Sequence, residues 1–291
     1  MIPASFEYFS PRTVPEAVHL LARYGPEAKL LAGGHSLVPL MKLRLAAPRY
    51  IIDLNRIDGL SYIREEDGVL RLGALTRHAE IEHSELIRAR YPLLADAARV
   101  ISDPLVRNMG TIGGSLAHAD PAGDWGAAML AAGAEVVAVG PGGTRTIPID
   151  GFFEGTFVTA LRPDEVLTEI RLPRAAKDAG GAYLKLERKV GDFAIAAVGV
   201  GLLLDGGGTC QQVGIGLCNV GPISLRAAQA SRLLSGRKPE ESVLARAAEA
   251  AAAECDPADD LRGPADYKRD MVRVLTLRAL RLAVQRARGG A

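Results

Sequence analysis

The sequence predicts an α+β protein built from two domains. At 291 residues the chain is long for a single domain. A polar stretch rich in Ala, Gly and Lys at 173–181 divides it. Beyond this stretch, three expected strands come in series and are followed by three expected helices, an order typical of an antiparallel sheet covered by helices. We therefore expect one domain over 1–176 and a second over 177–291, the latter with a three-stranded antiparallel sheet and a three-helix bundle.

The first domain alternates helices and strands. Apolar residues at helical spacing predict helices at 13–24, 36–45, 78–100 and 124–132. Pro92 is expected to break the segment 78–100 into two helices. Short apolar or alternating runs predict strands at 28–31, 50–54, 68–75, 134–139, 144–149 and 166–172. The turn Gly140-Pro141-Gly142-Gly143 joins two of these strands as a hairpin.

The second domain separates its strands from its helices. We expect strands at 182–188, 195–204 and 212–220. We expect helices at 225–234, 239–254 and 265–287. The last helix is highly charged, which fits either a solvated face or a surface that docks a partner.

Composition excludes several classes of protein. A formal net charge of +1 gives no reason to expect nucleic acid or an acidic membrane surface as partner. No apolar run approaches the ~20 residues that span a bilayer, and the N-terminus lacks the pattern of a secretory signal. The three cysteines have no CxxC or Cys/His spacing, so we expect no iron–sulfur cluster or zinc in this chain. We predict a cytoplasmic protein.

Two glycine pairs lie in nearly matching frames, Ala32-Gly33-Gly34-His35-Ser36 and Thr111-Ile112-Gly113-Gly114-Ser115. Each pair precedes a segment of helical character and offers backbone N–H groups with a hydroxyl residue close behind. Glycine lets a backbone approach phosphate oxygens closely, and such N–H groups bind anions without cationic side chains. Together the two loops predict a site for a long anionic ligand, such as the pyrophosphate of a dinucleotide.

Either loop taken alone is also consistent with an ordinary turn. Neither fits the GxGxxG fingerprint of nicotinamide-binding folds or the GxxxxGK[ST] phosphate loop of ATPases. Both of those classes are therefore disfavoured.

A turn with two aspartates follows the second glycine loop. Asp120 and Asp124 flank a Pro-Ala-Gly segment just before a helix. Asp124 is a natural cap for that helix, a role that leaves its carboxylate able to bind a ribose or another ligand hydroxyl. A metal site formed with His118 is an alternative, but no second histidine at helical spacing supports it.

A third segment spans 183–194. Period-two alternation places Lys185 on the face opposite Leu184 and Leu186. By pattern alone this is a solvated strand followed by a loop, with no catalytic role required.

Together, the three segments resemble the FAD-binding medium subunit of the molybdenum hydroxylases, the family of xanthine dehydrogenase and aerobic carbon monoxide dehydrogenase. The family pattern is AGGxS near the start, TIGG followed by a D-P-x-x-D-like segment, and KxxR…GD(Y/F)A at the domain junction. All three motifs occur here in that order. The resemblance covers essentially the whole chain. It implies an FAD-binding domain of the PCMH/vanillyl-alcohol oxidase type, in parts of about 1–57 and 58–176, and then a carbon monoxide dehydrogenase flavoprotein-like domain.

The resemblance implies which residues contact FAD. One side of the pyrophosphate would be held by the first loop and the residues leading into it, Lys29, Leu30, Leu31, Ala32, Gly33, Gly34, His35 and Ser36. The other side would be held by Thr111, Gly114 and Ser115. Asp124 and Asp120 would hold the ribityl or ribose part.

Four further residues would surround the rings. Ile101 would pack beside the cofactor, Leu167 near the adenine or flavin, Lys185 at the polar edge of the flavin and Phe193 near the isoalloxazine face. Two positions depart from the family pattern. Many relatives carry Asn where Ser115 stands, and relatives often carry Tyr where Phe193 stands.

The resemblance also implies a mechanism and partners. A large subunit with a molybdenum cofactor would hydroxylate the substrate, and a small subunit with two [2Fe–2S] clusters would relay electrons to FAD on this chain. FAD would pass them to NAD⁺, oxygen, a quinone or another carrier. The assembly would be a dimer of heterotrimers. FAD supplies the redox chemistry, so no catalytic acid–base residue is expected here.

Two other hypotheses stay open at the level of sequence. One is a stand-alone flavoprotein oxidase of the vanillyl-alcohol oxidase type, which needs a larger substrate domain and often a His or Cys flavin attachment. His35 is the only histidine inside a glycine loop. The other is a non-enzymatic assembly subunit whose glycine loops are only turns.

Overall fold

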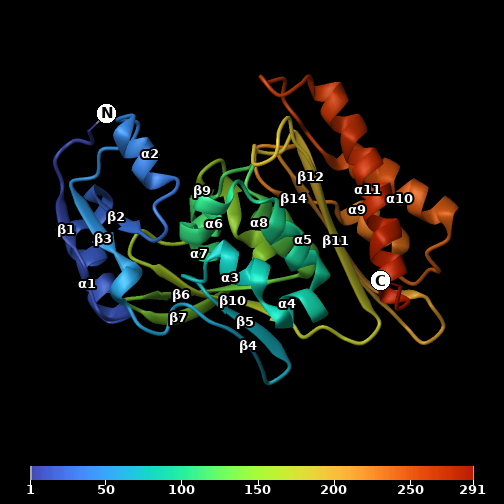
Figure 1. The fold of residues 1–291 in the computed structure, drawn as a ribbon, viewed down its shortest axis with the longest axis horizontal. Helices are drawn as coiled ribbons and strands as arrows, with labels where there is room; N and C mark the ends of the chain where they lie inside the picture. Colours follow the sequence, from blue (N-terminus) through green and yellow to red (C-terminus); the bar gives the residue numbers. More distant parts are fainter. Residues whose placement is uncertain (1, 291) are drawn as a thin grey trace.

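The computed structural model describes residues 2–290 and contains three parts that follow one another across the molecule. Each part has its own sheet, and the chain runs from a small N-terminal lobe through a central layer to a C-terminal sheet with helices (Figure 1). No helix among residues 2–290 is long and apolar enough to cross a membrane.

The N-terminal lobe is a three-stranded parallel sheet in the order β1-β3-β2. Its elements are β1 (Glu7–Phe9), α1 (Val14–Tyr24), the 3-10 turn η1 (Gly25–Glu27), β2 (Ala28–Leu31), α2 (Leu37–Lys42), β3 (Tyr50–Asp53) and the 3-10 turn η2 (Leu54–Arg56). Helix α1 buries Ala17, Val18 and Leu21 in the core of this lobe. The expected helix over 36–45 is confined to the six residues of α2.

The parallel pairing of β2 with β3 positions the first glycine loop. Leu31 lies opposite Asp53 in the register. Because the carboxyl ends of parallel strands meet at one sheet edge, the loop after Leu31 and the turn η2 after Asp53 emerge side by side.

The central part is a five-stranded antiparallel sheet in the order β4-β5-β10-β6-β7. Its strands are β4 (Ile63–Glu66), β5 (Val69–Gly73), β6 (Glu135–Gly140), β7 (Gly143–Pro148) and β10 (Val166–Pro173). The 3-10 turn η3 (Ile149–Gly151) and a separate two-stranded ribbon, β8 (Phe153–Gly155) and β9 (Val158–Thr159), follow β7.

Six helices cover the central sheet. They are α3 (His78–His83), α4 (Glu85–Arg90), α5 (Pro92–Val100), α6 (Pro104–Met109), α7 (Ile112–His118) and α8 (Asp124–Ala132). The expected break at Pro92 is present, since Pro92 is the first residue of α5. A second break separates α3 from α4, where the Ser84 hydroxyl accepts from the Ile87 N–H as an N-cap.

The C-terminal part is an antiparallel sheet of four strands, in sequential order. It contains β11 (Ala179–Leu186), β12 (Ala196–Leu204), β13 (Cys210–Cys218) and β14 (Leu225–Arg226), followed by α9 (Ala228–Leu234), α10 (Glu241–Glu254) and α11 (Ala265–Ala287). The three expected strands are present, but the prediction of a three-stranded sheet was wrong. Leu225–Arg226, which was expected to start a helix, pairs with β13 instead. Strand β11 also begins inside the stretch expected to be a linker.

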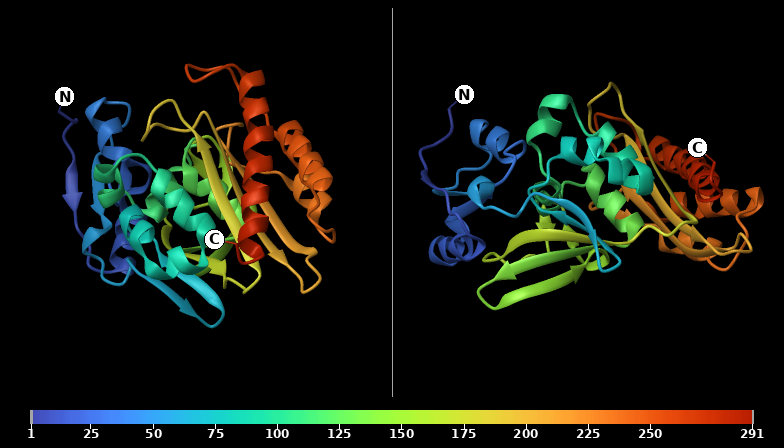
Figure 2. Two further views of the ribbon diagram at one scale, coloured as in Figure 1. Left: turned by 45° about the vertical axis from the view of Figure 1, so that its right-hand side comes forward. Right: turned by 60° about the horizontal axis from the view of Figure 1, so that its bottom comes forward.

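Helices pack on both faces of the C-terminal sheet. Figure 2 shows α11 running along β11 and β12, on which it packs. On the other face α8 lies against β12 and β13, close enough that a Cβ at Gly216 would be 2.0 Å from the Ala127 carbonyl oxygen. Helix α8 is thus enclosed between two sheets, which places Asp124, at its start, beside β11.

Candidate cofactor site

The first glycine loop connects β2 to α2 in a conformation that only glycine adopts easily. Gly34 has φ +75°, in the left-handed region. A Cβ at Gly33 would lie 2.2 Å from the carbonyl oxygen of Met109, which belongs to the chain just before the second glycine loop. The two glycines therefore have different roles. Gly34 allows the backbone to turn, and Gly33 allows the loop to pack closely against the chain at Met109.

Hydrogen bonds hold the carbonyl groups of this loop. Asn55 Nδ2 donates to the Ala32 oxygen at 2.8 Å, and His35 Nδ1 donates to the Gly33 oxygen at 2.8 Å. A trans peptide points its C=O and its N–H in opposite directions. The N–H groups of Gly33 and Gly34 are therefore turned away from the groups that hold the two carbonyls.

No backbone N–H from residue 33 to residue 36 has an acceptor within residues 2–290. A run of oriented, unpaired N–H groups ahead of a helix is the arrangement that binds phosphate oxygens. The first loop therefore offers the free N–H groups that the sequence analysis expected of it.

The second glycine loop is built differently. Thr111 caps α7, and its hydroxyl accepts from the Gly114 N–H at 3.1 Å. The N–H groups of Ile112, Gly113 and Ser115 bond to backbone oxygens at 3.0, 2.9 and 3.0 Å. The expectation that both loops offer bare N–H groups is therefore wrong for this one. Its contribution to a ligand would come from the hydroxyls of Thr111 and Ser115 and from the small size of Gly114.

The fold brings the two loops into contact. A Cβ at Gly114 would lie 3.6 Å from the Ala32 Cβ, and one at Gly33 would meet Met109 and Gly110. Residues 32–36 and 111–115, well separated in sequence, thus face one site. Residues Lys29, Leu30 and Leu31, also expected there, belong to β2, and only Leu31 reaches the loop, with Cδ1 3.4 Å from a Cβ at Gly34.

Asp120 shapes the turn between α7 and α8. Its Oδ1 accepts from the Ala122 N–H at 2.9 Å, and its backbone oxygen accepts from the Gly123 N–H at 2.9 Å. A Cβ at Gly123 would lie 3.8 Å from Ser115 Oγ, so this turn adjoins the second loop. Within the described residues, no group of three or more His, Cys, Asp and Glu side chains is arranged to hold a metal ion.

Asp124 does not cap α8, contrary to expectation, because the N-cap is Gly123 and Asp124 is the first helical residue. Its buried carboxylate instead accepts from Tyr183 Oη at 2.9 Å and from Lys185 Nζ at 3.1 Å. Burial raises the pKa of Asp124, against the lowering effect of Lys185. Burial and the neighbouring Asp124 raise the pKa of Tyr183, so its hydroxyl stays protonated and donates.

Lys185 is buried, with 2% of its side chain exposed, so the prediction of a solvated strand face was wrong. Its Nζ donates to the Val100 carbonyl oxygen at 2.9 Å and lies 3.6 Å from Glu187 Oε2. Alternation did place Lys185 correctly, opposite Leu184. That face is covered by α5 and α8, which the strand pattern alone does not reveal.

The three remaining predicted residues lie in different surroundings, and the structure does not bring them together. Ile101 follows Val100 at the end of α5 and is half-buried. Phe193 is 49% exposed, and the Arg262 guanidinium lies 5.5 Å from its ring centroid. Leu167 is buried in the central core on β10, opposite Ala138.

Three residues that the sequence analysis missed connect the site. They are Asn55 and Arg77 beside the glycine loops and Tyr183 beside Asp124. Tyr183 lies two positions before Lys185 and so shares its face, a signal that period-two alternation carries. Arg77 has no such signal in the sequence.

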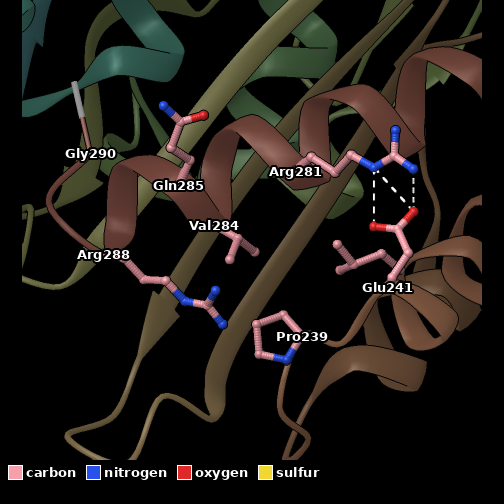
Figure 3. Close-up of a pocket in the computed structure, with 8 residues that line it drawn as sticks. Pro239, Glu241, Arg281, Val284, Gln285, Arg288 and Gly290 are labelled. Carbon is pink, nitrogen blue, oxygen red and sulfur yellow. Dashed lines mark hydrogen bonds and ion pairs between the residues drawn. The ribbon is translucent and has the colours of Figure 1, made fainter.

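Pockets elsewhere lie outside this site. The hollow in Figure 3, about 430 Å³, is lined by residues of α11 and by Pro239, with Arg281 paired to Glu241 across it. It lies at the opposite end of the molecule from the first glycine loop (Figure 1).

Comparison with known proteins identifies the class. Residues 4–175 match the family profile described as "FAD binding domain in molybdopterin dehydrogenase", and residues 181–283 match "CO dehydrogenase flavoprotein C-terminal domain". The chain therefore belongs to the FAD-binding flavoprotein subunits of the molybdenum hydroxylases, a family of oxidoreductases. The resemblance seen in the motifs is confirmed.

Within this family the chain is similar to medium chains of carbon monoxide dehydrogenase. It is 48% identical to that of Hydrogenophaga pseudoflava over 97% of this chain and 98% of the relative. A solved structure of carbon monoxide dehydrogenase from the same organism superimposes with a TM-score of 0.95 at 50% identity, covering 98% and 99% of the two chains. The alpha subunit of the 6-hydroxypseudooxynicotine dehydrogenase complex of Paenarthrobacter nicotinovorans is 38% identical, over 99% and 97% of the two chains.

Proposed function

We propose that this chain collects electrons on FAD from the [2Fe–2S] clusters of a small subunit and passes them to an external acceptor, while a large subunit oxidises substrate at a molybdenum cofactor. The observation that carries the proposal is the run of unpaired N–H groups over residues 33–36, in a loop that contacts the chain at the second glycine loop. Relatives of nearly the same length named as medium chains support it.

The residues proposed to contact FAD fall into three groups. The pyrophosphate lies between Lys29–Ser36 and the trio Thr111, Gly114 and Ser115, a pairing supported by the contact of the two loops. Asp124 and Asp120 hold the ribityl or ribose part; each Asp124 oxygen already accepts one hydrogen bond and has a further lone pair for a ligand hydroxyl. Ile101, Leu167, Lys185 and Phe193 surround the rings.

When bound, FAD supplies the electron-transfer chemistry. The chain binds it, orients it and tunes its electrostatic surroundings. Lys185 places a buried positive charge beside Asp124, within a region from which water is largely excluded. No residue of the site is required as a general acid or base.

We propose further that the chain divides functionally into 1–176 and 177–291 and works in a cytoplasmic dimer of heterotrimers. Several large apolar side chains are exposed to solvent and are available for contacts with partner subunits. Prominent among them are Leu45, Leu105, Val190 and Leu261, with exposed fractions of 73%, 75%, 94% and 95%. The comparisons favour this function over a stand-alone oxidase, since the relatives are subunits of complexes by name.

The test is the visible absorption spectrum of the purified chain, alone and assembled with its large and small subunits, with FAD added. We expect an oxidised-flavin spectrum in the wild type and its loss in Gly34→Val. Gly68→Val is the matched control, because Gly68 has φ +76° against +75° for Gly34 but lies in the β4–β5 turn with open space around it. Failure of both wild-type preparations to bind FAD would refute the proposal.

A further inference from the structure

Asn55 connects the first glycine loop to Arg77, which lies beside the second loop, although Asn55 is exposed to solvent. Its Nδ2 donates to the Ala32 carbonyl oxygen, and its Oδ1 accepts from Arg77 Nη2 at 2.6 Å. A carbonyl only accepts and a guanidinium only donates, so one orientation of the amide satisfies both. Asp53 Oδ1 accepts from the Asn55 backbone N–H at 3.0 Å and anchors the residue in η2.

Arg77 continues the bridge to the second loop. Its Nη1 donates to the carbonyl oxygen of Met109, and its backbone pairs with Thr111 in an isolated antiparallel bridge. The guanidinium is a planar fork, so its two acceptors are held at a fixed separation. Among the described residues Arg77 forms no ion pair, although the charges of Glu80 and Asp53 act on its guanidinium.

The bridge ends where the loops touch. The Met109 oxygen that Arg77 holds is the atom that a Cβ at Gly33 would meet. At the other end, the Ala32 oxygen held by Asn55 belongs to the same peptide as the Gly33 N–H. The chain of bonds Ala32–Asn55–Arg77–Met109, closed by the contact of Met109 with Gly33, therefore ties the first loop to the end of α6, two residues before Thr111.

We propose that Asn55 and Arg77 are positioning residues of the dinucleotide site, which set the spacing of the two glycine loops and aim the first-loop N–H groups at the pyrophosphate. The inference rests on the proposed function. It follows from the trans peptide: holding the Ala32 oxygen fixes the opposite direction of the Gly33 N–H. Such a restraint is needed because two adjacent glycines are otherwise free to rotate.

The test compares Asn55→Asp and Arg77→Lys with the wild type, in whichever preparation of the wild type binds FAD. Asn55→Asp keeps the shape but removes the Nδ2 donor to the Ala32 oxygen, together with its bond to Asp53 Oδ1 at 2.5 Å. Arg77→Lys keeps the charge but cannot reach two acceptors in fixed geometry. Asn108→Asp is the matched control, because it puts the same new charge on exposed α6, one residue from Met109. The readouts are FAD affinity, the ³¹P NMR shifts of bound FAD and the melting temperature of the FAD-free protein.

We expect Asn55→Asp and Arg77→Lys each to weaken FAD binding about tenfold. We expect the ³¹P resonances to move toward those of free FAD in both variants, the melting temperature to be unchanged in Arg77→Lys, and Asn108→Asp to change affinity by less than about twofold. Wild-type affinity and ³¹P shifts in both variants would overturn the inference and leave the proposed function standing. An equal loss in Asn108→Asp would also overturn it, since charge would then explain the effect. A wild type that binds no FAD would overturn both.

Discussion

Lys185 and Asp124 form a buried ion pair that joins the C-terminal sheet to the first turn of α8. The two atoms, Lys185 Nζ and Asp124 Oδ2, are 3.1 Å apart, and the side chains are 2% and 6% exposed. The same pair is proposed to face FAD. The residues proposed to tune the cofactor thus also join the C-terminal sheet to α8, so we expect stability and redox properties to be coupled at this point.

Lys185→Met is expected to destabilise the protein and to lower the reduction potential of the bound flavin. The variant leaves the Asp124 carboxylate buried without its cation, which costs about 3–5 kcal/mol. Loss of the positive charge also disfavours the anionic reduced flavin. The free energy of unfolding comes from urea denaturation and the potential from a dye-linked redox titration.

The double variant Lys185→Met/Asp124→Asn separates these effects. It should recover most of the stability, because no unpaired charge is left in the interior. A flavin potential equal to that of the wild type in Lys185→Met would rule out an electrostatic role for this lysine.

Tyr183→Phe is expected to weaken FAD binding while leaving the fold intact. The variant removes the hydrogen bond that orients Asp124 Oδ1 and costs about 1–2 kcal/mol of stability. Tyr62→Phe is the matched control, because the Tyr62 hydroxyl also donates to a carboxylate, Glu169 Oε2, in the central sheet. Both variants should melt at lower temperature, but only Tyr183→Phe should raise the FAD dissociation constant. Equal FAD affinity in the two would show that Tyr183 is structural only.

The sequence was sufficient for the motifs because glycine and strand periodicity act locally. It predicted the strand before the first loop, the loop itself and the side of β11 on which Lys185 lies. The sequence prediction failed for burial, which depends on how distant elements pack together. Lys185 was expected in water because the pattern of a strand does not reveal that helices cover its polar face.

The hydrogen bonds of Asn55 to Ala32 and Arg77 could not be predicted from the sequence for the same reason. Its partner Arg77 lies 22 residues away, and their contact depends on the pairing of β2 with β3 and on the position of α3. The second glycine loop shows the same limit, because similar sequence motifs can have different hydrogen bonds. The two glycine pairs look alike in sequence, but the N–H groups of the second pair's loop donate to the Thr111 cap and to backbone oxygens of Thr111 and of the segment just after β5.

His78 is expected to make the protein less stable in acid. Its Nδ1 accepts from Trp125 Nε1 at 3.0 Å, and burial, with the charge of Arg77 second, lowers its pKa from 6.5 to about 3. Between these values the unfolded chain binds the proton and the folded chain does not. Stability from this group is therefore full above pH 6.5 and falls by about 1.4 kcal/mol per unit as the pH drops toward 3.

Urea unfolding at pH 7.5, 6 and 5 measures this slope. His78→Gln should flatten it, because the glutamine oxygen accepts from Trp125 without titrating. His19→Gln, on the exposed face of α1, is the control and should keep the slope of the wild type. An unchanged slope in His78→Gln would assign the acid sensitivity to other groups.

Gly33→Ala is expected to separate the two glycine loops. The new Cβ would lie 2.2 Å from the Met109 oxygen and 2.8 Å from the Gly110 Cα, both backbone atoms that cannot yield as a side chain does. The overpacking costs about 1–3 kcal/mol, and FAD affinity should fall with it. Gly142→Ala, in the β6–β7 turn, is the matched control because no atom lies within 4 Å of its Cβ position. Thermal melting and FAD titration of both variants make the test. Wild-type behaviour of Gly33→Ala would mean that the spacing of the loops does not depend on this contact.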